Sequence, residues 1–395
     1  MSAYVLYFDS SDTGAPVMNN AVGSLIGVLD ACLINGFNNK AVASVNVASG
    51  VATATINGHG YSSVASKDVD IAGATPAALN GRKTITVLNA NTISFAAPGV
   101  ADGAATGTIT AKRSALAWTK EFTGTGKAIY KRSDVTAGVM MLRVDDSNVS
   151  PASATDARAF MVESATNVDT FTGQAPTQGQ LADGQYWNKG DNNATAKQWS
   201  LIGDSKGFYL TVQSNSTVLP NPTPNDSFSG AVCGMSDFKS LVVGDAYNTL
   251  LAGCDTAGGG GGTGGGVIGT ALNYGQNSSN RTMVAARPYN QVGASVQLTS
   301  VGIGSNYIAS FPLFPSPVDN GLLVNPTLLL TEQIASVAQV RGLLRGAVQM
   351  LAHRVLDHGS IIDTVANLPG RKLLIWQVYS IGGSTRFALD LTGPW

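Results

Sequence analysis

A glycine-rich turn that ends in lysine is the first candidate for chemistry in this chain. Residues 124–127 read Gly-Thr-Gly-Lys, the order found at the end of a phosphate-binding loop. That loop also needs a glycine five residues before Gly126, and a Ser or Thr after the lysine to hold Mg²⁺. Glu121 and Ala128 occupy these two positions. We therefore predict a tight turn here and no nucleotide site.

Neighbouring carboxylates are the second candidates. They occur as Asp68 with Asp70, Asp145 with Asp146, and Asp183 with Asp191. A glycosidase needs two carboxyl groups roughly 5–10 Å apart in a cleft, which spacing along the chain does not establish. The Asp-Asn-Asn run at 191–193 is an alternative Ca²⁺ ligand set, although it lacks EF-hand spacing. Because Asp beside turn residues usually caps its own backbone, we favour a structural role for these carboxylates.

Histidine and cysteine offer little more. The three histidines (His59, His353 and His358) occur in no His-Glu-x-x-His pattern, and the chain has neither a Cys-x-x-Cys nor a Gly-x-Ser-x-Gly motif. The three cysteines (Cys32, Cys233 and Cys254) are an odd number in apolar surroundings, so we predict buried free thiols. The chain is interpreted as a non-enzyme with no catalytic residue, metal or cofactor.

Aromatic and proline residues are the candidates for binding. Tyr186 and Trp187 lie between polar turn sequences, where aromatic rings could stack on sugars, so we name them as candidate ligand-facing residues. The alternative is a core tryptophan beside a turn. Candidate interface residues come from two segments whose backbone is restricted by proline, and these are Phe311, Pro312, Phe314, Pro315, Pro394 and Trp395. The alternative is that both segments cover the core of their own chain.

The composition restricts the fold and the partners. Charged residues make up 12% of the 395 residues, and the formal net charge is −1. Soluble domains usually carry about 25% charged residues, so long solvated helices are disfavoured. A nucleic-acid binder would carry a basic excess, which is missing. The start of the chain has no signal-peptide pattern and no apolar run is long enough to span a membrane, so we expect no membrane insertion.

Short alternating segments predict a mainly β fold: a multi-stranded β domain with one N-terminal helix and an inserted small all-β module. Residues 1–44 hold a strand and a helix that begins near Asn19 or Asn20 and ends at Gly36. Residues 45–112 form the module, and 113–395 form the main β-rich domain. Within the main domain, 197–214 is predicted to be a hairpin, and 337–352 a short helix. The glycine run 256–266 contains a Gly-x-Gly-x-x-Gly pattern but lacks the following helix of a dinucleotide site, so it is interpreted as a surface loop.

Several segments resemble virion proteins of tailed bacteriophages. The opening YVLYFDSSDTGAPVMNNAVGSLIGVLDACLINGF is similar to the start of a group of such proteins. The block 45–112 resembles a small β module of phage tail and fibre proteins, through GHGY at 58–61, IAGATP at 71–76, LNG at 79–81 and NTISF at 91–95. MSDFKSLVVGDAYNTLLAG at 235–253 and DLTGPW at 390–395 fit the same group. The resemblance implies a structural role in the tail or its tip and brings no catalytic residues.

The expected function is thus a structural component of a tailed-phage virion, a tail or baseplate subunit that assembles with other virion proteins. We expect it to be located in the virion, after assembly in the bacterial cytoplasm, and to form a symmetric ring with itself, trimeric or hexameric. Specific nucleic-acid binding is not expected. The alternative is a receptor- or carbohydrate-binding module of a fibre, collar or head decoration. A glycan depolymerase is the third and weakest interpretation.

Overall fold

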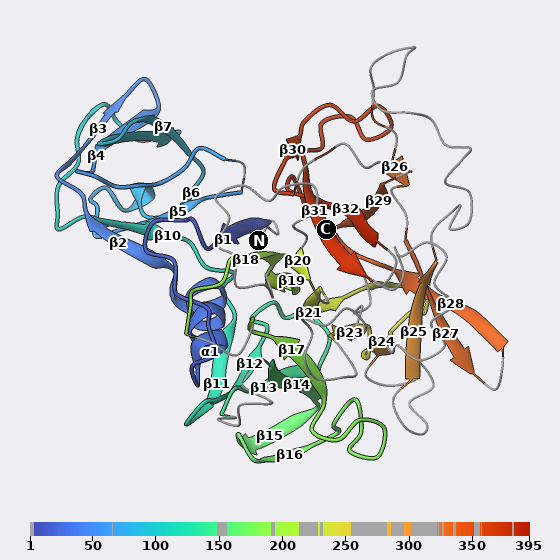
Figure 1. The fold of residues 1–395 in the computed structure, drawn as a ribbon. Coiled ribbons are helices and arrows are strands. Elements are labelled where there is room, and N and C mark those ends of the chain that lie inside the picture. Colours follow the sequence, from blue (N-terminus) through green and yellow to red (C-terminus); the bar gives the residue numbers. More distant parts are fainter. Residues whose placement is uncertain are drawn as a thin grey trace.

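The computed structural model describes residues 4–64, 66–147, 156–190, 194–212, 228–229, 232–253, 283–285, 296–301, 322, 324–325, 328–334, 337–350, 356, 358–380 and 383–395. These residues form a mainly β protein built from several sheets, with one α-helix near the start of the chain, which confirms the predicted fold class (Figure 1). Within these ranges, no helix is both long and apolar enough to cross a membrane.

The small β module has two sheets and its own core (Figure 1). One sheet consists of β2 (Phe37–Ala41), β10 (Thr110–Arg113), β5 (Val69–Ala72) and β6 (Gly81–Lys83), in that order. The other consists of β7 (Ile85–Asn89), β8 (Thr92–Ala96), β4 (Val51–Thr55), β3 (Ser44–Ala48) and β9 (Gly103–Ala104). A short 3₁₀ turn, η2 (Ala77–Leu79), lies between β5 and β6. The buried core residues all come from 45–111, but β2 pairs with β10, so the module begins before residue 45.

The main body is centred on a ten-stranded sheet. Its spatial order is β1 (Leu6–Asp9), β18 (Trp199–Asp204), β19 (Gly207–Val212), β21 (Cys233–Asp237), β23 (Thr249–Ala252), β24 (Met283–Ala285), β25 (Val296–Val301), β27 (Leu329–Ile334), β28 (Val337–Leu343) and β22 (Lys239–Ser240). The predicted hairpin at 197–214 is confirmed, because β18 and β19 pair from Trp199 with Val212 to Asp204 with Gly207. The predicted helix at 337–352 is wrong. Part of this segment is β28 and part is β29 (Ala347–Met350), which joins another sheet.

Two further sheets cover the two faces of the large one. A five-stranded sheet has the order β11 (Thr119–Gly124), β12 (Lys127–Lys131), β13 (Met141–Asp145), β14 (Asp156–Val162) and β17 (Gln185–Asn188), with a separate hairpin of β15 (Ser164–Asn167) and β16 (Thr170–Thr172). The C-terminal sheet has the order β20 (Phe228–Ser229), β31 (Leu373–Ser380), β32 (Gly383–Asp390), β29 and β26 (Val324–Asn325), and β30 (Ile361–Ile362) pairs with β31.

Alternation along the central strands divides the interior into two cores. Leu201, Phe208 and Leu210 pack toward the five-stranded sheet and the helix. Ile202 and Tyr209, next to them in the chain, pack toward the C-terminal sheet. Successive side chains of a strand point to opposite faces, so one hairpin contributes to both cores. The body is therefore three layers of sheet with two apolar interfaces.

The N-terminal helix starts later than predicted. It consists of α1 (Ser24–Leu29) and continues as a π-helical segment, η1 (Asp30–Asn35). The side chain of Asn19 accepts a hydrogen bond from the backbone of Ala21, so it stabilises a turn before the helix. The carboxylate of Asp146, at the end of β13, accepts from the N–H of Leu25 at 2.9 Å and takes the capping role. The predicted end at Gly36 is confirmed, with a positive φ of 67°.

Many of the few charged side chains lie inside the fold. Buried basic residues include Lys67, Arg113, Arg132, Arg143, Lys189, Lys197, Arg341 and Arg345, a third of the 24 in the sequence, and buried acidic ones include Asp68, Asp146, Asp156, Asp204 and Asp237. Most of the buried cations have a carboxylate partner, as desolvated charges require. Arg132 pairs with Asp237, Lys189 with Asp146, and Arg345 with Asp204.

Charged groups also attach the module to the body. The ammonium group of Lys67 pairs with the carboxylates of Asp9 and Asp12. Asp9 is the last residue of β1, and Asp12 lies in the turn that follows. The guanidinium of Arg113 donates to the backbone oxygens of Tyr7 and Asp68, each at 2.7 Å. The junction is thus held by ion pairs of Lys67 and hydrogen bonds of Arg113 at defined positions.

Candidate functional site

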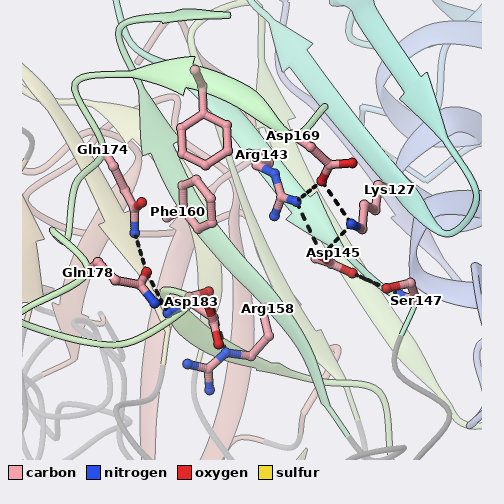
Figure 2. A pocket seen from close by; sticks show the side chains of 11 residues that line it. Lys127, Arg143, Asp145, Ser147, Arg158, Phe160, Asp169, Gln174, Gln178 and Asp183 are labelled. Atoms are coloured by element: carbon pink, nitrogen blue, oxygen red, sulfur yellow. Dashed lines mark hydrogen bonds and ion pairs between the residues drawn. The ribbon is translucent and has the colours of Figure 1, made fainter. Parts of the chain in front are cut away.

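A polar pocket lies on the face of the five-stranded sheet that points away from the central core (Figure 2). Its volume is about 570 Å³, within the roughly 300–1,000 Å³ range of small-molecule sites. The lining residues come from β12, β13 and the residues just after it, β14, the turn between β15 and β16, β16, and the segment 174–183. They are Lys127, Arg143, Asp145, Ser147, Arg158, Phe160, Asp169, Phe171, Gln174, Gln178 and Asp183.

Strand alternation places these side chains. On β13, Arg143 and Asp145 point to the pocket, while Leu142 and Val144 belong to the central core. On β14, Arg158 and Phe160 point to the pocket in the same way. The neighbouring residues of β14 pack into the core. Two adjacent strands thus present two polar or aromatic side chains each to one surface.

Four charges of alternating sign form a closed ring at one end of the pocket (Figure 2). The ammonium nitrogen of Lys127 lies 2.8 Å from Asp169 and 3.7 Å from Asp145. Nη2 of Arg143 lies 3.0 Å from Asp169 and 3.3 Å from Asp145. Asp169 sits in the turn between β15 and β16, and Arg143 also donates from Nε to the backbone oxygen of Val168 at 2.6 Å. The hairpin is therefore held to the sheet by this ring.

The ring favours the charged forms of Lys127 and Asp169. The hydrogen bond from Lys127 holds the pKa of the Asp169 carboxyl below its usual value, and the same bond raises the pKa of Lys127. The side chain of Asp169 is 59% exposed, so water reaches the ring. The pocket consequently offers Lys127, Asp145 and Asp169 within reach of water, with the buried guanidinium of Arg143 behind them.

Amide and guanidinium groups line the other end (Figure 2). Gln174 donates to Gln178 at 3.4 Å, and Gln178 donates to the carboxylate of Asp183 at 3.1 Å. The guanidinium of Arg158 donates to the backbone oxygen of Ala182 and lies 3.4 Å from the centre of the Tyr186 ring. These planar groups have restricted orientations and can both donate and accept hydrogen bonds.

The two candidate ligand-facing aromatics lie on opposite sides of the sheet. Tyr186 pairs with Arg158 across β17 and β14, on the pocket side, but the guanidinium of Arg158 covers its ring. Trp187 is fully buried in the central core and donates from Nε1 to the backbone oxygen of Ala252 at 2.9 Å. The expectation that Trp187 faces a ligand is wrong, because neighbouring strand residues point to opposite faces.

Trp395 lies against its own chain. It is 8% exposed, its ring centre is 5.6 Å from that of Tyr209, and its Nε1 donates to the backbone oxygen of Asp390 at 2.7 Å. We expected Trp395 to be an interface residue, but the structure places it in the core of its own chain. Pro394, the residue before it, is exposed. The remaining interface candidates, Phe311, Pro312, Phe314 and Pro315, lie outside the described residues, as do the glycine run 256–266 and residues 191–193.

A second hollow of about 580 Å³ opens beside Trp395. Its rim includes two loops, 133–139 and 240–246, which are joined by a backbone hydrogen bond from Val139 to Ala246. These loops carry exposed apolar side chains: Val135 at 97%, Val139 at 50%, Leu241 at 61% and Val243 at 101%. Exposed apolar residues gathered on two adjacent loops are typical of a surface that contacts another protein.

The motifs set aside in the sequence have mixed outcomes. Residues 125–126 form the turn between β11 and β12, as predicted, yet the following Lys127 belongs to the charged ring. Asp145 and Asp146 point to opposite faces, one into the pocket and the other to the helix. Cys32 and Cys233 are buried and free, as predicted, while Cys254 lies outside the described residues. Among the described residues, no cluster of three or more His, Cys, Asp or Glu could hold a metal ion.

Sequence reasoning missed most of the pocket. Arg143, Arg158, Asp169, Gln174 and Gln178 belong to no motif. One sequence signal could have revealed the pocket: polar residues at every second position of a strand whose other positions are apolar. In Met141–Asp145, Arg143 and Asp145 alternate with apolar residues in this way. Comparison with known proteins adds no assignment, since neither a family model nor a curated protein matches the chain.

Proposed function

We propose that this chain is a structural subunit of a tailed-phage virion, located in the tail or baseplate, where it assembles with other virion proteins. The proposal rests first on the resemblance of the opening segment, the module and the segments 235–253 and 390–395 to such proteins. In this fold the module is a separately packed unit attached to a three-layer body.

One observation carries the proposal furthest: the chain has few charged residues, and part of these are buried. Only 12% of the residues are charged, and at least a third of the Lys and Arg side chains are buried. Charged residues are about as frequent among the buried residues as in the whole sequence, so the outer surface is as poor in charge as the composition indicates. Free monomers usually carry about 25–35% charged residues on their surface, which keeps them apart. A surface of uncharged polar and apolar residues suits permanent contact with neighbouring subunits.

The exposed loops beside the second hollow are the proposed contact surface. Val135 and Val243 are almost fully exposed on adjacent loops, where burial against a partner would remove apolar area from water. In a closed ring, trimeric or hexameric, every copy of such a surface can be covered.

The test is the composition and structure of intact particles. Mass spectrometry of purified virions and a cryo-electron-microscopy map should place several copies of this chain in the tail or baseplate, in symmetric contact. Sedimentation at tens of micromolar should show an oligomer that Val243→Asp weakens. A matched control is Leu88→Asp, which changes an exposed side chain of the module. Absence from purified particles would refute the proposal.

A receptor- or carbohydrate-binding module on the same particle is the second candidate function. The polar pocket is the observation that favours it, because its charges and amides are accessible to a ligand. Binding of the purified chain to intact host cells tests this function, and lack of binding to cells that the phage infects would count against it.

A further inference from the structure

We propose that the pocket of the five-stranded sheet binds a neutral, hydroxyl-rich ligand, a short saccharide without acidic groups. The inference rests on the second candidate function and names the ligand class for it. It is carried by the alternation of charge around the pocket together with the fixed amide chain opposite.

The charges of the pocket cancel. Its ionisable lining groups are three cations and three carboxylates, namely Lys127, Arg143, Arg158, Asp145, Asp169 and Asp183. An anionic ligand would be repelled by the carboxylates while the cations attract it. A cationic ligand would be repelled by the cations while the carboxylates attract it. A neutral ligand avoids both repulsions, so the electrostatics favour it over either charged class.

Hydroxyl groups match the hydrogen-bonding capacity that remains. A carboxylate accepts at about four lone-pair positions. Lys127 and Arg143 both bind one oxygen of Asp169 and leave positions on its other oxygen unused, whereas Asp145 is occupied by Lys127, Arg143 and Ser147. Each sugar hydroxyl can donate to a carboxylate and accept from a neighbouring cation. Alternating donors and acceptors thus fit adjacent hydroxyls of one sugar ring.

The pocket is ordered before any ligand arrives. The ring of ion pairs restrains Lys127 and Arg143, and the hydrogen-bonded chain restrains Gln178 and Asp183. Groups that are already fixed lose little conformational entropy on binding. The half-exposed Phe171 adds an apolar edge for the C–H groups of a sugar.

The aromatic faces make this a hydrogen-bonding site and not a stacking site. The guanidinium of Arg143 lies 4.9 Å from the ring centre of Phe160 and 5.4 Å from that of Phe171, so it already occupies these rings. Without a free aromatic face, a single site should bind weakly. Several copies in a symmetric assembly would raise the apparent affinity through avidity, by about 10²–10⁴-fold.

Ligand-observed NMR and calorimetry on the full chain test the inference. The probes are neutral trisaccharides (maltotriose, cellotriose, mannotriose and triacetylchitotriose) and one acidic trisaccharide, trigalacturonate. We expect saturation-transfer signals and measurable binding heat with at least one neutral probe, and a weaker response with the acidic one. Asp169→Asn and Gln178→Ala should each lower the affinity about tenfold, since the first replaces an acceptor oxygen by a donor and the second removes an amide, at opposite ends of the pocket.

Glu121→Gln is the matched control, because it makes the same carboxylate-to-amide change at an exposed position of β11 outside the pocket. Its affinity should stay within about twofold of the unmodified chain, as expected for a surface change. No response to any neutral probe, a stronger response to the acidic one, or affinity unchanged in both pocket variants would overturn the inference. If the chain binds host cells under those conditions, the receptor-binding function survives and only the ligand class is wrong.

Discussion

Replacing Trp395 by alanine should destabilise the chain itself. The indole lies between Tyr209 and the turn at Gly346, where an added Cβ would come 2.2 Å from Cδ2 of the tryptophan. It also donates to the backbone oxygen of Asp390. These contacts join the ten-stranded sheet to the C-terminal sheet, so the substitution opens a cavity in the second core.

The expected loss follows from the buried area. A buried tryptophan removes about 150–250 Å² from water, and large-to-small changes of this kind cost about 3–5 kcal/mol of unfolding free energy. With an m-value of about 3 kcal/mol/M in urea, the midpoint should fall by about 1–2 M. Trp395→Phe retains most of the apolar contact and should lose less.

Urea unfolding followed by far-UV circular dichroism measures this loss. Val243→Ala is the control, because its side chain is fully exposed and its truncation should change the free energy of unfolding by less than about 0.5 kcal/mol. If Trp395→Ala leaves the midpoint unchanged and instead weakens self-association, the residue is an interface residue and the packing argument fails.

Three further outcomes are expected. A fragment of residues 36–114 should give a dispersed amide NMR spectrum, since it contains β2 and the whole separate core; a random-coil spectrum would contradict this. Asp237→Ala should lower the free energy of unfolding by about 3–5 kcal/mol in urea titration, because it leaves the buried Arg132 cation without its carboxylate partner. A loss below about 1 kcal/mol would count against a buried pair. The hydrogen bond from Lys127 lowers the pKa of Asp169 in the folded state, so its contribution to stability is present above the unfolded pKa of about 3.9 and lost as the pH falls through the folded value. Asp169→Asn should therefore flatten the acid limb of a melting-temperature profile, and an unaltered limb would show that the ring contributes nothing.

The local sequence pattern was sufficient to predict those strands and turns whose structure is determined by their own residues. The hairpin at Asp204–Gly207 has polar turn residues between two alternating runs, and the strands of the module repeat that arrangement. The prediction of a helix at 337–352 was wrong because the mixed spacing of its apolar residues is compatible with either a helix or a strand. There, pairing of β28 with β27 and of β29 with β32 decides the outcome, and a single segment does not contain that information.

The alternation of side chains along β17 could have shown that Tyr186 and Trp187 do not both face a ligand. Tyr186 and Trp187 are consecutive, so a strand must send one of them outward and the other inward. Which residue goes in depends on the cross-strand partners, Arg158 for the tyrosine and Ala157 for the tryptophan. Alanine leaves room for an indole, whereas arginine can cover a phenol ring and remain hydrated.

Ion pairs between distant residues lay beyond sequence reasoning altogether. Arg345 meets Asp204 across 141 positions, and Arg132 meets Asp237 across 105. Such pairs are fully desolvated, and their geometry keeps the layers in register at a desolvation cost that only a close partner can offset. The sequence shows few charges but not where they lie.

The ring around Lys127 differs from these internal pairs. The side chains of Lys127, Asp145 and Asp169 are 26%, 22% and 59% exposed, so water and salt screen their attraction, although Arg143 is only 7% exposed. Exposed pairs contribute about 0–1 kcal/mol, so stability alone gives little reason for Lys127 to join the pairs of Arg143 with Asp145 and Asp169 in a chain that has few charges. A ligand that uses both signs of charge at once gives a reason, and the neutral trisaccharide experiment decides between that account and a merely structural clamp on the hairpin.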